Sequence, residues 1–390
     1  MNLIFLSNYF NHHEKPLCEA LYNTEGVDFL FIQTERMEEE RVKMGWGIDT
    51  SLIPYVKNYA DAPEENKKLV MDADAVIFGG IDDESYIMDR LEAGKLTLRY
   101  QESIYKEGRW KFVSPKGLKK KQHDHTRFND SPVYLLCAGA YVAKDFSLIN
   151  AYKGKKYVWG YFPEARRYDI NSLLDKKNES GVCEILWSGR MTDWKHPELA
   201  IDTAVYLNFE GIPFHLTMAG GGDMEEELRK RVHDAGLDGK VSFTGFLRPS
   251  EIRSLMEKAS VYLFTSSRKE GWGAVLNESM NSGCAVVASY DAGSVPFMVR
   301  DGENGFTFNN KKDLFKKTEK LLADDELRKK LGKNAYITVR DKWNAELAAE
   351  RLSGWLLTGC VEVPELYLSE SAPDWLKDIP APMDMVSKEI

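Results

Sequence analysis

The sequence predicts an α/β protein made of two doubly wound, Rossmann-like domains. Short apolar runs alternate with segments of helical periodicity, which is typical of parallel sheets covered by helices. The chain has 390 residues, more than one hydrophobic core usually organises. Between Tyr157 and Ser180 the alternation is interrupted by Gly160, Pro163 and a charged run, which predicts a domain boundary there.

The first half is expected to form an N-terminal Rossmann-like domain over residues 1–160, followed by an interdomain linker over 161–180. Its clearest helix is Lys15–Tyr22. The expected strands are short apolar runs at Leu3–Leu6, Asp28–Ile32, Ala75–Phe78, Leu96–Tyr100 and Val133–Leu136.

The second half is expected to form a C-terminal Rossmann-like domain over residues 181–355. Its strands are expected at Val182–Trp187, Phe214–Met218, Val241–Thr244, Val261–Phe264, Ala285–Ala288 and Gly305–Phe308. Helices are expected at Pro197–Phe209, Met224–Ala235 and Ser250–Lys258. Residues 356–390 are rich in Pro, Glu and Asp, and we expect them to form an irregular tail that packs back on the N-terminal domain.

The composition favours a globular cytoplasmic protein. A net charge of -9 argues against general nucleic-acid binding. The N-terminus lacks a basic-then-apolar signal pattern, and no apolar run is long enough to span a membrane. The five cysteines are scattered, mostly in apolar runs, which predicts reduced core residues. No Cys/His spacing predicts a metal site, and His123 and His125 are expected to be solvated on a charged loop.

A basic stretch lies near Gly117. Lys116, Lys119, Lys120 and Lys121 are followed by Arg127. One interpretation is a solvated loop. The other is a surface that contacts anionic lipid headgroups, with each basic residue contributing about 1 kcal/mol; the protein would then lie peripherally at the inner membrane face.

The segment Glu270-Gly-Trp-Gly-Ala-Val-Leu-Asn-Glu278 carries the strongest functional pattern. It follows an apolar run and opens a helical one, so one carboxylate lies in a loop and the other in a helix. Glycines let a backbone approach an anion closely, and a helix N-terminus offers free N–H groups to a phosphate. Carboxylates would repel that phosphate and should face hydroxyls instead. A diphosphate flanked by polyols describes a nucleotide sugar.

The region from Gly181 to Phe308 resembles retaining GT-B glycosyltransferases, family 4 in particular. The resemblance rests on the Glu-x7-Glu pair and four further blocks: Ser188-Gly-Arg-Met-Thr-Asp-Trp-Lys195, Met218-Ala-Gly-Gly-Gly-Asp223, Val241-Ser-Phe-Thr-Gly-Phe246 and Asp301-Gly-Glu-Asn-Gly305. The GT-B architecture has two Rossmann-like domains facing across a cleft. The resemblance implies that the C-terminal domain holds the donor and the N-terminal domain the acceptor.

The resemblance also implies roles for individual residues. Arg190 and Lys195 would hold the diphosphate of the sugar nucleotide. Arg190 would offer the N–H groups of its planar guanidinium, and Lys195 the concentrated charge of its ammonium. Glu278 would accept hydrogen bonds from the ribose, and Glu270 would lie beside the transferred sugar. The backbone of Gly273, Ala274, Val275 and Leu276 would meet the distal phosphate. Gly220, Gly221 and Phe246 would border the nucleotide, although a simple tight turn is nearly as good an explanation for the glycines.

The sequence departs from the family pattern at three places. Gly79-Gly80 stands where the family often has a histidine, and Phe297 stands where an acidic residue is common. The usual glycine-rich loop after the first strand is replaced by Ser7-Asn-Tyr-Phe-Asn-His-His-Glu14. His12 or His13 would then serve the acceptor hydroxyl, as an imidazole that titrates near neutrality; helix capping or solvation would explain the pair equally.

These features predict a retaining, metal-independent hexosyltransferase with no cofactor besides its donor. The donor would be a nucleotide-diphosphate sugar and the acceptor a hydroxyl of a glycan, glycolipid or other molecule, in polysaccharide or glycoconjugate biosynthesis. Two alternatives remain open. One is a nucleotide-sugar 2-epimerase or phosphorolytic enzyme of the same fold, and the other is a non-catalytic protein that binds sugar nucleotides.

Overall fold

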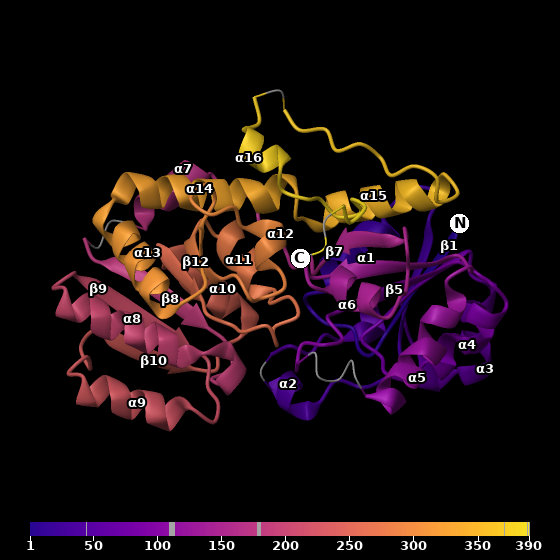
Figure 1. The fold of residues 1–390 in the computed structure, drawn as a ribbon, viewed down its shortest axis with the longest axis horizontal. Coiled ribbons are helices and arrows are strands. Elements are labelled where there is room, and N and C mark those ends of the chain that lie inside the picture. The colour runs from indigo at the N-terminus through magenta and orange to yellow at the C-terminus, as the bar shows by residue number, and fades with distance from the viewer. Residues whose placement is uncertain (44, 109–113, 178–180, 370, 388, 390) are drawn as a thin grey trace. The chain divides into compact units, whose positions relative to one another are not determined.

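The computed structural model describes residues 1–390 apart from 44, 109–113, 178–180, 370, 388 and 390 (Figure 1). The chain divides into two compact units. The first consists of Met1–Glu164, Asn344–Tyr367 and Pro380–Ile390, and the second of Ala165–Trp343 and Leu368–Ile379.

This division differs from the expected boundaries at two places. Residues 165–176 belong to the second unit, where helix α7 (Ile170–Lys176) replaces the expected linker; the end of that linker, 178–180, lies outside the described residues. Helix α15 (Ala345–Leu357) belongs to the first unit, although we expected the second domain to reach 355. The reason is aromatic packing, because Trp355 lies 4.9 Å from Tyr134 and 5.1 Å from Tyr157, measured between ring centroids.

The described part of the first unit contains one sheet of seven parallel strands, in the order β3-β2-β1-β4-β5-β6-β7. The strands are β1 (Asn2–Ser7), β2 (Asp28–Gln33), β3 (Val56–Asn58), β4 (Ala75–Gly79), β5 (Thr97–Gln101), β6 (Val133–Ala138) and β7 (Lys156–Trp159). Most residues of β1, β4 and β6 are buried, which explains why these strands are continuous apolar runs. Strands β3 and β7 were not predicted, because β3 is short and polar and β7 is short and begins with a lysine.

Helices cover both faces of this sheet (Figure 1). They are α1 (Lys15–Tyr22), α2 (Glu39–Lys43), α3 (Pro63–Asp72), α4 (Ser85–Glu92), α5 (Pro115–Asp124), α6 (Val142–Leu148) and α15. The basic stretch forms helix α5 and not a loop. Its N-cap is Ser114, whose hydroxyl accepts a hydrogen bond from the amide of Gly117 at 3.4 Å.

The described part of the second unit contains a sheet of six parallel strands, in the order β10-β9-β8-β11-β12-β13. The strands are β8 (Cys183–Ser188), β9 (Phe214–Ala219), β10 (Val241–Gly245), β11 (Val261–Phe264), β12 (Ala285–Ser289) and β13 (Phe306–Phe308). All six were predicted to within one residue at each end, because their apolar runs are short and bounded by polar or glycine residues.

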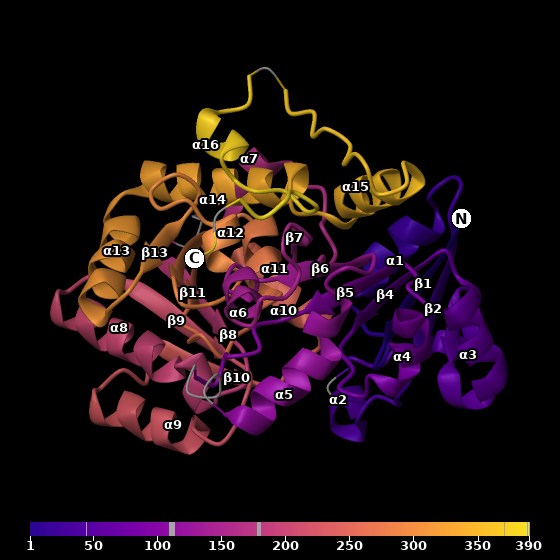
Figure 2. The same cartoon turned by 45° about the vertical axis from the view of Figure 1, so that its right-hand side comes forward.

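The helices of the second unit, besides α7, are α8 (Pro197–Phe209), α9 (Glu225–Asp234), α10 (Pro249–Lys258), α11 (Val275–Asn281), α12 (Val295–Met298), α13 (Lys311–Ala323), α14 (Asp325–Asp341) and α16 (Asp374–Lys377). Helices α8, α9 and α13 pack side by side, and α10, α11 and α14 form a second group (Figure 2). No helix of the described residues has both the length and the apolar character needed to cross a membrane.

In both sheets the strand order reverses beside the first strand of the unit. The reversal lies between β1 and β4 in the first sheet and between β8 and β11 in the second. Ligands of open parallel sheets bind outside the carboxyl ends of the strands at such a reversal. Each unit therefore has one position where a ligand site is expected.

Candidate functional site

An ion pair lies at the strand reversal of the second sheet. Lys195 ends the short 3-10 helix Asp193–Lys195 that follows β8, and Glu270 lies in the loop after β11. Lys195 Nζ and Glu270 Oε2 are 2.5 Å apart, and the two side chains are only 13% and 11% exposed. The two predicted residues thus meet where the carboxyl ends of β8 and β11 lie together.

A row of hydroxyl groups directly after β11 holds this pair in place. Ser266 Oγ donates to Glu270 Oε2 at 3.0 Å, and Thr265 Oγ1 donates to the carbonyl of Lys195 at 2.7 Å. Thr265 in turn accepts a hydrogen bond from Trp187 Nε1 at 2.8 Å. The sequence analysis missed these residues. Their signal was the run Thr265-Ser-Ser267, three hydroxyl side chains at the carboxyl end of a buried strand.

Arg190 and Lys195 share the ring of Trp194. The Arg190 guanidinium lies 6.0 Å from the ring centroid, and Lys195 Nζ lies 4.7 Å from it. Arg190 is exposed, whereas Lys195 is mostly buried. The structure therefore brings together, at one aromatic ring, the two cations that the sequence predicted for a diphosphate.

Glu278 lies on α11 and is partly buried. Its charge acts on Tyr262, whose pKa is raised first by burial and further by Glu278. Tyr262 Oη is itself 2.8 Å from Ser188 Oγ, at the carboxyl end of β8. Gly273 begins the turn into α11 with φ +86°, and a Cβ there would lie 2.5 Å from the ring of Phe264. Ala274, Val275 and Leu276 follow it into the helix.

The glycine loop after β9 packs directly on the loop after β8. A Cβ at Gly220 would lie 2.0 Å from the carbonyl oxygen of Gly189, and one at Gly222 would lie 2.8 Å from that of Met191. Close backbone packing thus accounts for Gly220 and Gly222. Gly221 lies beneath the ring of Phe246, which is 52% exposed and follows β10. A nucleotide role for Gly220, Gly221 and Phe246 stays a prediction.

His12 and His13 lie in the loop after β1, in the first unit. Their ring centroids are 3.9 Å apart, and the ring of Trp46 lies 5.3 Å from His12 and 6.0 Å from His13. Burial lowers the pKa of His12 to about 4. The expectation of an imidazole titrating near neutrality is therefore wrong for His12, which is neutral at pH 7. The catalytic role of either histidine stays a prediction.

Two other sequence expectations have a structural outcome. His125 is buried, with Nδ1 2.8 Å from the hydroxyl of Tyr152, and is not the solvated residue we expected. The five cysteines are free thiols. Phe297, at the position of the missing acidic residue, is buried and stacks on Trp343 with ring centroids 6.2 Å apart. That position therefore contributes apolar packing.

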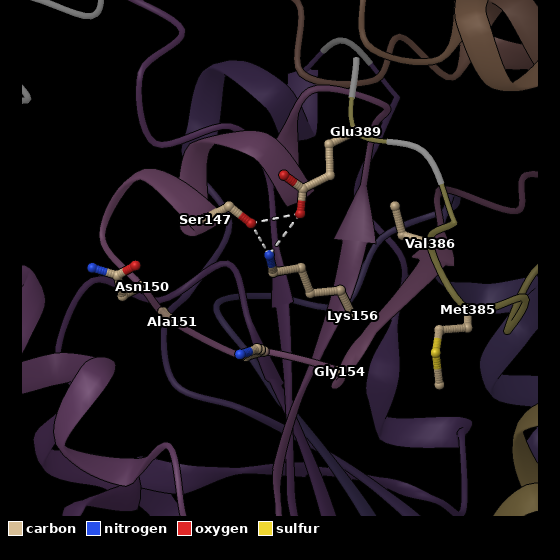
Figure 3. Close-up of a pocket in the computed structure, with 9 residues that line it drawn as sticks. Ser147, Asn150, Ala151, Gly154, Lys156, Met385, Val386 and Glu389 are labelled. Carbon is tan, nitrogen blue, oxygen red and sulfur yellow. Dashed lines mark hydrogen bonds and ion pairs between the residues drawn. The ribbon is translucent and has the colours of Figure 1, made fainter.

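A surface pocket in the first unit involves none of the predicted site residues. It lies at the amino end of β7 and is formed by Ser147, Lys156, Glu389 and their neighbours (Figure 3). Lys156 Nζ is 2.9 Å from Glu389 Oε1 and also donates to Ser147. In a parallel sheet all carboxyl ends of the strands lie at one edge and all amino ends at the other. The pocket therefore lies at the edge opposite the position where a ligand is expected, outside the carboxyl ends of β1 and β4. In the described part of the chain, no group of three or more His, Cys, Asp or Glu side chains is placed to hold a metal ion.

Comparisons with known proteins concern mainly the second unit. The family described as "Glycosyl transferases group 1" matches residues 173–338. The chain is 28% identical over 193 residues to the alpha-D-kanosaminyltransferase of Streptomyces kanamyceticus, covering 49% of each protein. It is 30% identical over 134 residues to the lipopolysaccharide core biosynthesis glycosyltransferase LpsE of Rhizobium meliloti, covering 34% of this chain and 38% of LpsE. The chain spans half or less of the length of these curated relatives.

Solved structures resemble the whole chain. Anabaena Alr3699/HepE in complex with UDP matches with a TM-score of 0.68 and 17% identity, over 92% of this chain and all (100%) of HepE. A glycosyltransferase from Rickettsia africae ESF-5 matches with a TM-score of 0.67 and 16% identity, over 93% of this chain and 98% of that one. At these identities the likeness concerns the fold. The predicted fold class is confirmed: the chain has the GT-B architecture, and its residues 173–338 are similar to the glycosyl transferases group 1 family.

Proposed function

We propose that this protein is a retaining glycosyltransferase that moves a hexose from a nucleotide-diphosphate sugar to a hydroxyl acceptor. The observation that carries the proposal is the Lys195–Glu270 pair at the strand reversal of the second sheet, within the region similar to the glycosyl transferases group 1 family. It supplies a cation for a diphosphate and a carboxylate for sugar hydroxyls within one site. Solved complexes of the structurally similar HepE with UDP and with UDP-glucose support a uridine nucleotide as the first donor to test.

The proposed reaction is a front-face displacement. The bond between the sugar C1 and the diphosphate breaks, and the acceptor hydroxyl attacks from the same face. Arg190 and Lys195 stabilise the negative charge that grows on the departing diphosphate. Glu278 holds the ribose, and Glu270 hydrogen-bonds the transferred sugar. No protein nucleophile takes part, and two cations at the diphosphate make a metal ion unnecessary.

The acceptor is proposed to belong to polysaccharide or glycoconjugate biosynthesis. The names of two relatives support this, since LpsE is a lipopolysaccharide core biosynthesis glycosyltransferase and AmsK of Erwinia amylovora is an amylovoran biosynthesis glycosyltransferase. We also propose a cytoplasmic location with α5 in contact with anionic lipid. Lys116, Lys119 and Lys120 are exposed on this helix, while Lys121 lies with Nζ 5.4 Å from the ring centroid of Tyr105.

The function is tested in two steps with the purified full chain. Thermal unfolding with a panel of UDP-, GDP-, ADP- and dTDP-sugars identifies the donor, because a ligand at 100 times its Kd stabilises by about 2.7 kcal/mol. The donor is then incubated in EDTA with and without glycoside acceptors, and products are analysed by NMR. A new α-linked product from an α-linked donor supports the proposal. Conversion of donor into an epimer without acceptor would identify an epimerase, and binding without any turnover would identify a non-catalytic protein.

A further inference from the structure

The pocket at the amino end of β7 contains a buried ammonium group. The Lys156 side chain is only 10% exposed, and its Nζ lies 2.9 Å from Glu389 Oε1. Lys156 Nζ also donates to Ser147 Oγ, and Ser147 Oγ donates to Glu389 Oε1 at 2.5 Å. One carboxylate oxygen thus accepts from both an ammonium and a hydroxyl (Figure 3). Lys156 and Ser147 together form an anion receptor.

The carboxylate in this receptor is supplied by the C-terminal segment, which runs antiparallel to β7. The amide of Met383 donates to the carbonyl of Val158 at 2.8 Å, and the amide of Val386 donates to that of Lys156 at 3.0 Å. These backbone bonds do not involve the Glu389 side chain, which is 38% exposed. The carboxylate can therefore leave Lys156 while the segment stays paired with β7.

The cavity beside the receptor has room for a small organic molecule. Its volume is about 360 Å³, which lies in the range of about 300–1,000 Å³ that is typical of ligand pockets. Besides the receptor and Glu389, it is lined by Asn150, Ala151, Lys153, Gly154, Met385 and Val386. Met385 and Val386 offer apolar surface to a carbon skeleton, and Asn150 offers a side-chain amide.

The turn that forms one wall of the cavity is fixed in an unusual conformation. Asn150, Tyr152 and Gly154 have φ of +57°, +56° and +67°, and a tyrosine rarely adopts such a conformation. The side chain of Asn129 holds this turn, because its Nδ2 donates to the carbonyl of Asn150 at 2.7 Å and its Oδ1 accepts from the amide of Tyr152 at 3.1 Å. The wall is therefore shaped before a ligand binds.

The charges of the lining favour a phosphate monoester over a carboxylate. Lys153 and Lys156 face one carboxylate, Glu389, so the lining has one excess positive charge, and two when Glu389 moves away. A ligand carboxylate would replace one negative charge by another, whereas a phosphate monoester brings a charge of about −1.5 to −2 at pH 7. Ser147 lies in the last turn of α6, whose partial negative charge opposes any anion. The larger charge of the phosphate offsets that opposition.

We propose that this pocket binds a soluble phosphate monoester, whose phosphate replaces the Glu389 carboxylate on Lys156 and Ser147. The inference does not depend on the proposed glycosyl transfer, since every residue that lines the pocket belongs to the first unit. The ammonium and the hydroxyl of the receptor donate to phosphate oxygens, and Lys153 adds a second positive charge. Glu389 is then an internal competitor that the ligand displaces.

The test is isothermal titration of the purified full chain with glycerol 3-phosphate and ribose 5-phosphate. Lys156→Met should weaken binding about 10-fold or more, because charge-assisted hydrogen bonds to the phosphate are lost. Glu389→Gln should strengthen binding up to about 5-fold, because a neutral amide competes less for the partly exposed pair. Lys68→Met, a change of an exposed lysine on α3, should bind as the wild type does. Glycerol and glycerate should bind more weakly than glycerol 3-phosphate.

The variants also locate the bound ligand. A phosphate could bind at Arg190 in the second unit instead, so Arg190→Ala should leave the titration unchanged. Loss of binding in Arg190→Ala and not in Lys156→Met would overturn the inference, as would the absence of binding to the wild type. Weaker binding by Glu389→Gln would show that the carboxylate belongs to the site and does not compete for it, which also overturns the inference.

Two comparisons test the class of ligand. Inorganic phosphate that binds as tightly as both esters would show a simple anion site and overturn the assignment to a monoester. Lys156-dependent binding to phosphatidylcholine vesicles that contain phosphatidic acid, without binding of the soluble esters, would overturn the soluble ligand. If Lys156→Met does not fold, Ser147→Ala and Glu389→Gln decide: the first should weaken binding and the second should strengthen it, and affinities equal to that of the wild type in both would overturn the inference.

Discussion

Lys195 and Glu270 are bound to each other, with Nζ and Oε2 2.5 Å apart and both side chains mostly buried. Each charge therefore has a partner before any substrate arrives. A diphosphate that binds Lys195 has to compete with Glu270, and Glu270 gains freedom to bind sugar hydroxyls when the lysine turns to phosphate. Donor binding and release of Glu270 would then be a single event.

This pair should be strongly coupled in a double-mutant cycle. Removing one partner leaves a buried charge, so Lys195→Met or Glu270→Gln should each lower the free energy of unfolding by about 3 kcal/mol. The double variant should be much closer to wild type in stability, while remaining inactive. Urea denaturation measures all four proteins. The exposed pair Lys67–Asp89, 2.8 Å apart, is the control and should show a coupling of about 0–1 kcal/mol.

Glu278→Ala should weaken donor binding. A carboxylate that accepts hydrogen bonds from ribose hydroxyls contributes about 1.5–3 kcal/mol, which corresponds to a rise in Kd of about 10- to 150-fold. Isothermal titration with the donor measures it. Glu226→Ala, on the exposed face of α9, should bind as the wild type does. Equal affinities for both variants would remove Glu278 from the nucleotide site.

Arg190→Ala should lower turnover more than donor affinity. Charge on the diphosphate grows toward the transition state, so a cation placed there acts mainly on kcat. Single-turnover kinetics separate the chemical step from binding. Lys230→Ala, an exposed change on α9, is the comparison. If Arg190→Ala turned over substrate as fast as Lys230→Ala, Arg190 would not bind the diphosphate.

The pH dependence of stability should report the carboxyl of Glu14. Its folded pKa is about 8 against an ordinary value of 4.5, so the folded chain keeps a proton that the unfolded chain releases. The free energy of unfolding therefore falls as pH rises between about 4.5 and 8, and the loss is complete above about 8. Glu14→Gln cannot ionise. Its stability relative to wild type should increase across this range, whereas that of Glu19→Gln should stay constant.

Gly220→Ala should severely destabilise the second unit. The new Cβ would lie 2.0 Å from the carbonyl oxygen of Gly189, at a residue with φ +125°. Gly239→Ala is the control, because a Cβ there meets no atom within 4 Å. Thermal unfolding and soluble yield compare the two. A Gly220→Ala protein as stable as Gly239→Ala would contradict the packing of the β9 loop on the β8 loop.

The sequence was most informative where strands are buried on both faces. Strands such as β11 and β12 are uninterrupted apolar runs, and their ends were predicted closely for that reason. Elements that depend on distant partners were not predicted. Strand β7 begins with a lysine that pairs with Glu389, and α15 is fixed in the first unit by Trp355 on two tyrosines. Neither contact can be inferred from neighbouring residues.

The candidate site also contains residues that the sequence predicts and residues that depend on distant contacts. Arg190, Lys195 and Glu270 are implied by the resemblance to the family's motifs, and the structure brings the last two into contact. Ser266 was not predicted. Its hydroxyl donates to Glu270 only because the loop after β11 brings the two side chains together, and a serine has no distinctive signal for such a contact in the sequence. Glu14 ends the loop after the first strand, where the sequence pattern favours its neighbours His12 and His13 as functional residues. Ser7 and Asn11 donate hydrogen bonds to Glu14, and these contacts cannot be inferred from the sequence.

The return of residues 368–379 to the second unit limits how that unit can be isolated. The ammonium of Lys342 donates to the carbonyls of Lys377, at 3.0 Å, and of Ile379, and Arg300 donates to the carbonyl of Asp378 at 2.5 Å. A fragment ending at Trp343 would keep Lys342 and lose both of these acceptors. An excised second unit would therefore need residues 368–379 supplied as a fused segment, or as an added peptide that acts as a folding partner in trans.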